Sequence, residues 1–499
     1  MIHKVITATP NGFKAAIVEI ETDVSNGLPA TIIVGLPDVV VQESKERVRS
    51  AIRNSSFKYP VTRISINLAP GNIPKVGSHF DLAIALSVLL AGELVQFDPA
   101  NKMFIGELAL DGSVRPSFGV LAMALAAKEH GIKDIFVPIQ NAKEAALVSG
   151  LNVFGVSCLS EVIEHLIEVK ILERTSIEIG SIVGDTEVIV DFADISGQLL
   201  AKRALVIAAS GFHNLRMVGS PGSGKTMLAK ALSGILPPLS QSEIVETTNL
   251  YSLAGVLKSS YVSTAPFRSP HHTASSISLV GGGAKPKPGE VSLAHNGVLF
   301  LDELPEFPRH VLEVLRQPLE ENQIVISRAN NTIKFPAKFI LVSAQNPCHC
   351  GNYGDPLLTC SCHPSEVIKY NKKISGPLLD RIDLHVNVPR LKFSELRFNQ
   401  NQQTSEEVRA QVLESRKLQL KRFGRNKYNS EMNTKDLKLY CKLDLETEQL
   451  LSKAADSLQL SGRSINRLLK VTRTIADLEN SQDIKKQHLA ESLQYRISE

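Results

Sequence analysis

Tryptophan is absent from this sequence of 499 residues, and aromatic residues make up only 5% of it. A binding surface that grips its ligand mainly by stacking on aromatic rings is therefore not expected. Lys and Arg together number 55, and Asp and Glu together number 51. Net charge by itself thus indicates no nucleic-acid partner, and any basic surface must be local. No apolar run reaches the roughly 18 residues that would span a bilayer, which argues against a membrane protein.

Cysteine is also scarce, with six residues in the whole chain. So few thiols in so long a chain do not form a disulfide framework. The first residues alternate like a β-strand, and they lack the apolar core and small-residue cleavage site of a secretory signal peptide. We therefore expect a protein of the cytoplasm.

The length and the changing residue patterns predict several domains. Residues 1–170 mix strand and helix patterns, so a mixed α/β domain is expected there. Residues 171–190 are β-branched and mildly acidic with no helical face, which is typical of a linker. Residues 191–395 repeat strand, loop and helix, whereas residues 396–499 show mainly helical periodicity. The pattern of residues 191–395 predicts a domain built on a parallel sheet, and that of residues 396–499 predicts a C-terminal helical lid.

Individual elements follow from the same periodicities. A strand is expected at 62–69, and a helix is expected at 81–92. A second N-terminal helix should end at Gly131 and lead into a buried strand. In the central domain, NLRMVGS, GVLFLDE and KFILVSAQN read as apolar strands that end in polar residues, where ligands gather in parallel sheets. An amphipathic, basic helix is expected at 405–423.

A phosphate-binding loop lies between the strand LRMV and a helix, the context that confirms such a motif. The sequence GSPGSGKT matches G-x-x-x-x-G-K-[ST]. Its glycines let backbone N–H groups face a phosphate, its lysine neutralises the β and γ oxygens, and its threonine ligates Mg²⁺. The predicted nucleotide-binding residues are Gly219, Ser220, Pro221, Gly222, Ser223, Gly224, Lys225 and Thr226.

Polar residues that end the next two strands suit nucleotide hydrolysis. Asp302 and Glu303 follow the buried run VLFL, so one carboxylate can hold Mg²⁺ and the other can polarise the attacking water. Asn346 ends the third strand and is placed to orient that water. We therefore predict an ATPase centre at this edge of the sheet.

Two segments are candidates for binding a polyanion such as DNA. After a long helix that follows Glu303, ENQIVISRANNTIKFPAKF alternates around the turn dipeptide Asn330 and Asn331, which predicts a hairpin. Arg328 and Lys334 lie near its tip, and the alternative is an ordinary surface hairpin with solvated charges.

The second candidate segment is the Gly/Pro-rich stretch 278–290, which carries Lys285 and Lys287 and reads as an irregular cationic loop. Just upstream, Arg268, His271 and His272 lack metal-ligand spacing, so we expect packing or subunit-interface roles for them.

Four of the six cysteines fall within fifteen positions, directly after the third strand. Two pairs joined by a short loop can close a tetrahedral Zn²⁺ site, although the spacing of one residue within each pair is tighter than usual. The alternative is a cluster of reduced thiols. The candidate zinc ligands are Cys348, Cys350, Cys360 and Cys362, with His349 and His363 in reserve.

Long motifs give the chain a resemblance to a known family. The blocks around the phosphate loop, FRSPHHTASSISLVGGG, GEVSLAHNGVLFLDELPEF, SAQNPCHCGNYGD and ISGPLLDRIDL resemble the magnesium-chelatase-like AAA+ proteins. GLPDVVVQESKERVRSAIRNS and RISINLAPGNIPKVGSHFDLAIAL also match the N-terminal domain of the ComM/YifB subgroup. The resemblance covers nearly the whole chain. It implies a Lon-protease-like N-terminal domain of the S5 domain 2 type, an AAA+ domain and a helical lid.

The resemblance also implies roles for particular residues. Asp302 and Glu303 would be the Walker B pair and Asn346 the sensor 1 residue, and Arg381 would reach the nucleotide of a neighbouring subunit. A sensor 2 arginine is expected at Arg463, with Arg467 as the second choice. The family further implies a hexameric ring. For the subgroup, it implies an ATP-dependent DNA helicase that drives branch migration in recombination during natural transformation, with recombination proteins as candidate partners.

Two other functions compete with this interpretation. Lon-type peptidases need a serine nucleophile and a lysine base, but His79 and Leu121 stand at those positions and Ser78 would lack a base. We therefore expect the N-terminal domain to bind or assemble rather than to cleave peptides. The alternative for the whole chain is an ATP-driven remodeller of a protein or metallation complex of the magnesium-chelatase type, and stimulation of ATP turnover by branched DNA would discriminate the two.

Overall fold

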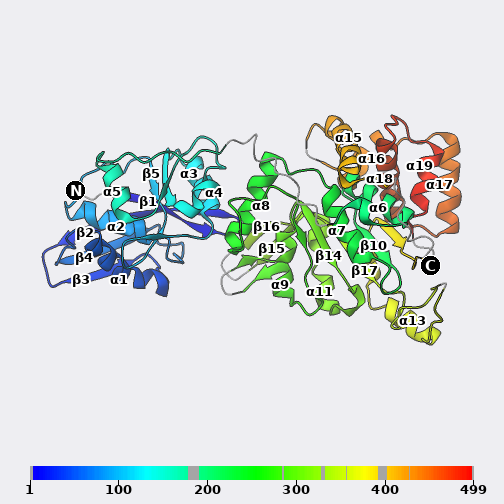
Figure 1. Cartoon of the computed structure of the whole chain (residues 1–499), viewed down its shortest axis with the longest axis horizontal. Helices are drawn as coiled ribbons and strands as arrows, with labels where there is room; N and C mark the ends of the chain where they lie inside the picture. Colours follow the sequence, from blue (N-terminus) through cyan, green and yellow to red (C-terminus); the bar gives the residue numbers. More distant parts are fainter. Residues whose placement is uncertain are drawn as a thin grey trace. The chain divides into compact units, whose positions relative to one another are not determined.

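The computed structural model describes residues 4–177, 190–283, 286–327, 332–355, 357–391, 402–425 and 427–496 (Figure 1). These residues divide into two compact units. The first unit comprises the described residues of Met1–Val183, Ser240–Ser263 and Ile326–Phe335. The second comprises the described residues of Gly184–Leu239, Thr264–Val325 and Pro336–Glu499. Two segments from the middle of the chain therefore pack with the N-terminal residues.

The first unit is built on a seven-stranded mixed sheet with the order β3-β4-β2-β1-β5-β8-β9. β2 pairs antiparallel with both β1 and β4, whereas the pairs β3–β4, β1–β5, β5–β8 and β8–β9 are parallel. The strand predicted at 62–69 is confirmed as β4. The strands are β1 (Lys4–Asn11), β2 (Lys14–Ser25), β3 (Ala30–Val34), β4 (Arg63–Ala69), β5 (Lys102–Phe104), β8 (Asp134–Pro138) and β9 (Asn152–Val156), beside a small pair of β6 (Glu107–Leu108) and β7 (Val114–Arg115).

Helices α2 and α3 pack on β1 and β2 and are buried along nearly their whole length. Their residues are apolar on all sides, as expected for a helix enclosed by a core. The predicted helix at 81–92 is thus confirmed, and Gly131, at φ +75°, follows the end of α3 before the buried strand β8. The helices of this unit include α1 (Val39–Asn54), α2 (Asp81–Ala91), α3 (Val120–Glu129), α4 (Ala142–Ala145), α5 (Leu159–Leu166) and α8 (Gln241–Ala254).

Helix α8 and strand β16 (Thr332–Pro336) contact the N-terminal residues of the first unit through polar and apolar groups. The Asn249 side chain of α8 donates a hydrogen bond of 2.9 Å to the carbonyl of Phe13, in the β1–β2 turn. The Ser252 hydroxyl accepts one of 3.0 Å from the backbone N–H of Gly119. At the same turn Gly12 lies so close to Ile333 of β16 that an added Cβ would be 2.8 Å from its Cγ2. The N-terminal fold therefore holds α8 and the β16 strand of the hairpin directly.

The second unit contains a five-stranded sheet in which all strands are parallel, in the order β11-β14-β17-β10-β18. Residues of β14 and β17 are all buried, because helices such as α6 (Leu199–Gly211) and α7 (Lys225–Ile235) cover the sheet. The three strands predicted from apolar runs are confirmed as β10, β14 and β17. The strands are β10 (Leu215–Val218), β11 (Phe267–Arg268), β14 (Gly297–Leu301), β17 (Phe339–Gln345) and β18 (Leu384–Asn387).

The C-terminal part of the second unit is helical, as predicted. Helix α15 begins with a capping box in which Thr404 and Glu407 satisfy each other's backbone N–H groups, and it covers the predicted range 405–423. Helix α18 packs against α6, α15 and α19 and buries its apolar face there. The helices are α15 (Ser405–Phe423), α16 (Thr434–Tyr440), α17 (Leu445–Ser457), α18 (Gly462–Leu478) and α19 (Lys486–Leu493).

Two local predictions were wrong. Instead of one long helix after Glu303, two short helices occur, because Pro318 lacks the N–H that would continue the hydrogen-bond ladder from the preceding turn. The described residues of 278–290 are not an irregular loop throughout, because β12 and β13 form a small antiparallel pair in which Gly282 lies opposite Lys287. The elements concerned are α9 (Ser276–Val280), β12 (Gly281–Gly282), β13 (Lys287–Pro288), α10 (Glu290–Leu293), α11 (Arg309–Glu313) and α12 (Arg316–Glu321).

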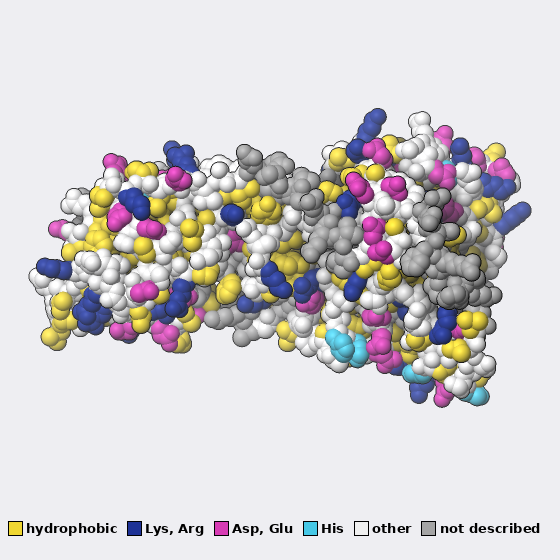
Figure 2. All heavy atoms as spheres, viewed as in Figure 1, with side chains coloured by type: hydrophobic (Ala, Val, Ile, Leu, Met, Phe, Trp, Pro, Cys, Tyr) yellow, Lys and Arg dark blue, Asp and Glu magenta, His cyan; other side chains and the backbone are white. Residues whose placement is uncertain are grey.

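The predicted hairpin exists as the two-stranded sheet of β15 (Gln323–Ser327) and β16 (Thr332–Pro336). Its turn residues Asn330 and Asn331 lie outside the described residues. On the face of the molecule in Figure 2, Lys and Arg side chains are interspersed with Asp and Glu, in line with the near balance of charge. Among the described helices, none is long and apolar enough to cross a membrane.

Candidate functional site

The phosphate loop connects β10 to the N-terminus of α7, where backbone N–H groups and the helix dipole favour an anion. Gly224 precedes the helix at φ +90°, a conformation that side-chain-bearing residues rarely adopt. Gly219 is equally constrained, since an added Cβ would lie 2.1 Å from the carbonyl oxygen of Val388. The glycines of the motif are therefore required by the shape of the loop.

The Lys225 side chain lies across this loop and is 8% exposed. Its ammonium donates hydrogen bonds to the carbonyls of Gly219 at 2.7 Å and Ser220 at 2.9 Å, and to the Asn346 side chain at 3.3 Å. Burial lowers the pKa of Lys225, and the nearby charge of Asp302 opposes that shift. The lysine thus already contacts the predicted sensor residue at the end of β17.

The acidic pair follows β14, next to β17 in the sheet. The Thr226 hydroxyl donates a hydrogen bond of 3.1 Å to Oδ2 of Asp302. Glu303 takes a left-handed backbone conformation, at φ +52°, and its side chain is 52% exposed. Hydroxyl and carboxylate oxygens that converge in this way are the hard ligands that Mg²⁺ prefers. The structure therefore brings Lys225, Thr226, Asp302 and Asn346 into one cluster.

His272, for which a packing or subunit-interface role was predicted, lies at the same centre. Nδ1 of His272 is 3.2 Å from Oε2 of Glu303. The imidazole can orient the carboxylate, which suits a residue that must polarise a water molecule. Arg268 lies nearby in sequence and forms two 2.7 Å contacts with Glu290. The motif SPHHT would have been the signal for His272, but no spacing rule links it to Glu303.

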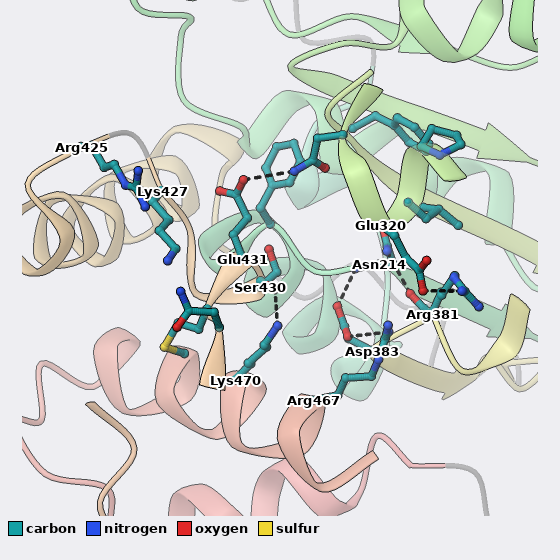
Figure 3. Close-up of a pocket in the computed structure, with 17 residues that line it drawn as sticks. Asn214, Glu320, Arg381, Asp383, Arg425, Lys427, Ser430, Glu431, Arg467 and Lys470 are labelled. Atoms are coloured by element: carbon teal, nitrogen blue, oxygen red, sulfur yellow. Dashed lines mark hydrogen bonds and ion pairs between the residues drawn. The ribbon is translucent and has the colours of Figure 1, made fainter. Parts of the chain in front are cut away.

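Arg381 and Arg467 line a different part of the second unit. A cavity of about 690 Å³ is lined by both arginines, by Asp383 and by Lys470, and the phosphate-loop residues are not among its lining (Figure 3). Arg381 is 6% exposed, and its guanidinium contacts Glu320 and the carbonyl of Pro377. Its Nε has no hydrogen-bond partner among the described residues.

Arg467 makes a different contact in the same cavity. Its Nη1 donates to Oδ1 of Asp383 at 3.1 Å. Burial alone would raise the pKa of Asp383, but the hydrogen bond with His213 and the charge of Arg467 outweigh burial and hold that pKa below its ordinary value. Arg463, the first choice for sensor 2, is exposed at the start of α18 and does not line the cavity. The structure thus places Arg467 beside Arg381.

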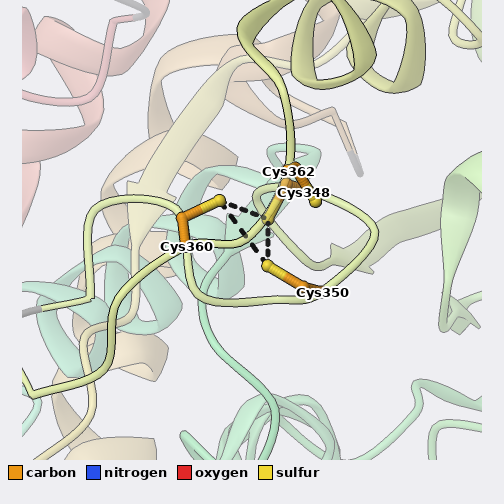
Figure 4. Close-up of side chains that lie close together, drawn as sticks. All are labelled: Cys348, Cys350, Cys360 and Cys362. Atoms are coloured by element: carbon orange, nitrogen blue, oxygen red, sulfur yellow. Dashed lines mark hydrogen bonds between the residues drawn. The ribbon is translucent and has the colours of Figure 1, made fainter.

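The four clustered cysteines converge in space (Figure 4). The sulfur of Cys348 lies 3.3 Å from that of Cys350 and 3.7 Å from that of Cys360, and all four sulfurs lie within 4.8 Å of one another. Backbone N–H groups of Asn352 and Ser361 hydrogen-bond the Cys350 thiol and lower its pKa to about 5. A spacing of one residue within each pair therefore does not keep the sulfurs apart.

The basic residues proposed for the polyanion grip are only partly described. Lys334 is exposed on β16, and Lys287 is exposed on β13. Arg328 and Lys285 lie outside the described residues. One candidate residue of each segment is therefore described.

In the N-terminal fold, the residues at the Lon-type catalytic positions have other surroundings. Ser78 donates a hydrogen bond to the Glu107 carboxylate rather than to a lysine. Burial lowers the pKa of His79 to about 4, and Leu121 is fully buried. Lys75 is also buried and donates to the carbonyl of Pro70. These contacts suit structural roles.

Comparison with known proteins matches the chain along nearly its full length. Family models described as "Magnesium chelatase, subunit ChlI", "Subunit ChlI of Mg-chelatase" and "Magnesium chelatase, subunit ChlI C-terminal" match residues 191–396, 20–141 and 402–496. The competence protein ComM of Haemophilus influenzae is 46% identical over 495 residues, which cover 97% of this chain and 95% of that protein. The uncharacterized protein YifB of Escherichia coli is 41% identical over 496 residues, with the same shares covered. A Lon protease of Lachnoclostridium phytofermentans is 30% identical over 161 residues, which cover 30% of this chain and 20% of that protease.

Proposed function

We propose that this chain is a hexameric ATP-driven motor that moves branched DNA. The chain belongs to the ComM/YifB subgroup of the magnesium-chelatase-like AAA+ ATPases. Its proposed task is branch migration during recombination of incoming DNA in natural transformation. A relative named as a competence protein, similar along nearly its whole length, supports this assignment.

The hydrogen-bonded cluster at the carboxyl ends of β10, β14 and β17 carries the proposal. Lys225 reaches Asn346 at 3.3 Å, and Thr226 reaches Asp302 at 3.1 Å, so the phosphate loop and both neighbouring strand ends meet at one place. Thr226 and Asp302 would hold Mg²⁺, which supplies charge neutralisation on the β and γ phosphates. Glu303 accepts a proton from the attacking water, and Asn346 orients that water.

The two arginines of the cavity suit a nucleotide held by another subunit. Arg381 and Arg467 line one cavity, and the phosphate loop of the same chain does not contribute to it. An arginine that stabilises transition-state charge must reach the γ-phosphate. In a ring made by one repeated head-to-tail interface, this surface would face the neighbour's nucleotide. We therefore assign Arg381 as the finger in trans and prefer Arg467 to Arg463 as sensor 2.

The DNA grip is assigned to the hairpin and to the β12–β13 segment. Lys334 and Lys287 are exposed, and Arg328 and Lys285 stand close to them in sequence. Cations on such segments bind phosphates without reading bases, so binding should be independent of sequence and should weaken with salt. The shortage of aromatic residues also favours a backbone grip over base stacking.

The four-cysteine cluster is assigned as a structural zinc site. A sulfur–zinc distance of about 2.3 Å in a tetrahedral site puts the sulfurs about 3.8 Å apart. The sulfurs here lie within 4.8 Å of one another, and three of the separations are 3.3 to 3.7 Å. The donor set therefore fits Zn²⁺ better than a hard cation such as Mg²⁺.

A second candidate function is an ATP-driven remodeller of a protein or metallation complex, since the matching family models are described as magnesium chelatase. The two are separated by measuring ATP turnover of the full chain with and without a forked DNA or a four-way junction. A DNA motor predicts that branched DNA raises turnover, while the Glu303→Gln protein binds ATP but stays inactive. An active parent protein that ignores DNA would favour the remodeller.

A further inference from the structure

The cysteine loop, defined as the described residues of 348–362, lies against the phosphate loop. We infer that it acts as a brace for that loop, so that Zn²⁺ in the four-thiol site and nucleotide in the phosphate loop bind cooperatively. The inference rests on the zinc site and the ATP site assigned above. It does not depend on DNA.

The closest contact joins Gly351 to Pro221 at the tip of the phosphate loop. Gly351 is buried and has a φ of +81°. A Cβ added there would lie 2.5 Å from Cδ and 2.6 Å from Cγ of Pro221, far inside van der Waals contact. The backbone of residue 351 can approach the Pro221 ring so closely only because residue 351 has no side chain. A shift of the cysteine loop toward the phosphate loop at this point must therefore displace Pro221.

A second contact is polar and involves Asp355. The Ser220 side chain lowers the pKa of the Asp355 carboxyl below its ordinary value, and Oδ2 of Asp355 lies 3.5 Å from Nε of Arg390. Arg390 in turn donates a hydrogen bond of 3.4 Å to the carbonyl of Pro221. Arg390 thus connects Asp355 of the cysteine loop to the backbone of the phosphate loop.

A third connection runs along the chain itself. Asn346, which accepts a hydrogen bond from Lys225, stands two residues before Cys348. Between the end of β17 and the start of α13 (Pro364–Asn371), the described residues form no helix or strand. Such a loop needs another source of order, and a metal that cross-links four of its side chains provides it. Losing the metal would therefore loosen the groups that shape the phosphate loop.

Cooperativity of this kind is reciprocal. If Zn²⁺ strengthens nucleotide binding by some factor, then bound nucleotide must strengthen Zn²⁺ binding by the same factor. Couplings in proteins typically reach about 5- to 150-fold, and we expect about tenfold here. ADP affinity and the rate of Zn²⁺ release can therefore both test this coupling factor, and neither depends on ATP turnover.

The test uses the full-length protein and fluorescently labelled ADP. Removing Zn²⁺ with a chelator should weaken ADP binding about tenfold, and adding Zn²⁺ back should restore it. Release of Zn²⁺ to a metal-sensitive dye should be about tenfold slower with ADP present. Equal ADP affinity with and without Zn²⁺, in protein that binds one Zn²⁺ per chain, would overturn the inference and leave the zinc site intact. Protein that binds no Zn²⁺ would overturn both the inference and the assignment of the zinc site.

A matched pair of glycines separates the brace from general disruption of the loop. Gly351→Ala should weaken ADP binding and should abolish the effect of ADP on Zn²⁺ release, while the protein still binds Zn²⁺. Gly354→Ala is the control, because Gly354 has a similar φ of +75° but an added Cβ would meet nothing within 4 Å. It should behave as the parent. Identical behaviour of the two variants would contradict a specific contact between the loops.

Discussion

Replacing Arg381 with alanine tests whether the ATPase centre is completed by a neighbouring subunit. The cavity that Arg381 lines contains no phosphate-loop residue, so nucleotide binding by a single chain should not change. Turnover should fall by at least about 10³-fold, the lower end of the effect of arginine fingers. That loss corresponds to about 4 kcal/mol of transition-state stabilisation.

The assay compares ATP hydrolysis by three preparations: Arg381→Ala alone, Lys225→Ala alone, and an equal mixture of the two. Each variant alone should be inactive. In a randomly mixed ring, about one quarter of the interfaces would combine an intact phosphate loop with an intact Arg381, so part of the activity should return. Glu320→Ala is the control, since it removes the acidic partner of Arg381 but leaves the guanidinium in place.

Two results would refute this reasoning. If Arg381→Ala hydrolysed ATP at the parent rate, the residue would have no part in turnover. If the equal mixture stayed inactive although the two variants assembled together, Arg381 would act within its own chain. Loss of activity in Glu320→Ala equal to that in Arg381→Ala would instead assign the effect to the ion pair.

The remaining predictions concern the other assigned groups. Glu303→Gln should bind ATP without hydrolysing it, whereas Lys225→Ala should fail to bind ATP. Equilibrium binding and a phosphate-release assay would distinguish the two variants. Hydrolysis by Glu303→Gln at the parent rate would rule out Glu303 as the base. Elemental analysis should find about one zinc per chain, lost on Cys348→Ser, and metal-free parent protein with four titratable thiols would reject the site. Alanine at Lys334 or at Lys287 should flatten the dependence of DNA affinity on salt by roughly one unit per lost phosphate contact, and an unchanged slope would remove that residue from the grip.

Much of the ATPase centre could be predicted from sequence because its signals are local. The phosphate loop needs glycines at fixed offsets between a strand and a helix, so GSPGSGKT predicts both its conformation and its ligand. Asp302 and Asn346 could be placed near it because each ends an apolar strand, and parallel strands present their carboxyl ends at one edge. The hydrogen bonds Lys225–Asn346 and Thr226–Asp302 agree with that geometry.

Other features depend on contacts between residues far apart in sequence, which no local pattern encodes. The packing of α8 with the β1–β2 turn joins Asn249 to Phe13 across most of the first half of the chain. The contact of His272 with Glu303 and the approach of Gly351 to Pro221 likewise arise only when the sheet brings separate loops together. The spacing rule for zinc pairs was also a poor guide, because loop conformation decides whether sulfurs converge.

Branch migration of a synthetic four-way junction by the purified full-length protein tests the central claim most directly. The account predicts that ATP and Mg²⁺ drive conversion of the junction into two duplexes. It also predicts that Glu303→Gln binds the junction without converting it, and that the junction raises ATP turnover of the parent protein. A parent protein that hydrolyses ATP, yet neither converts the junction nor responds to it, would contradict a DNA motor and favour the remodelling function.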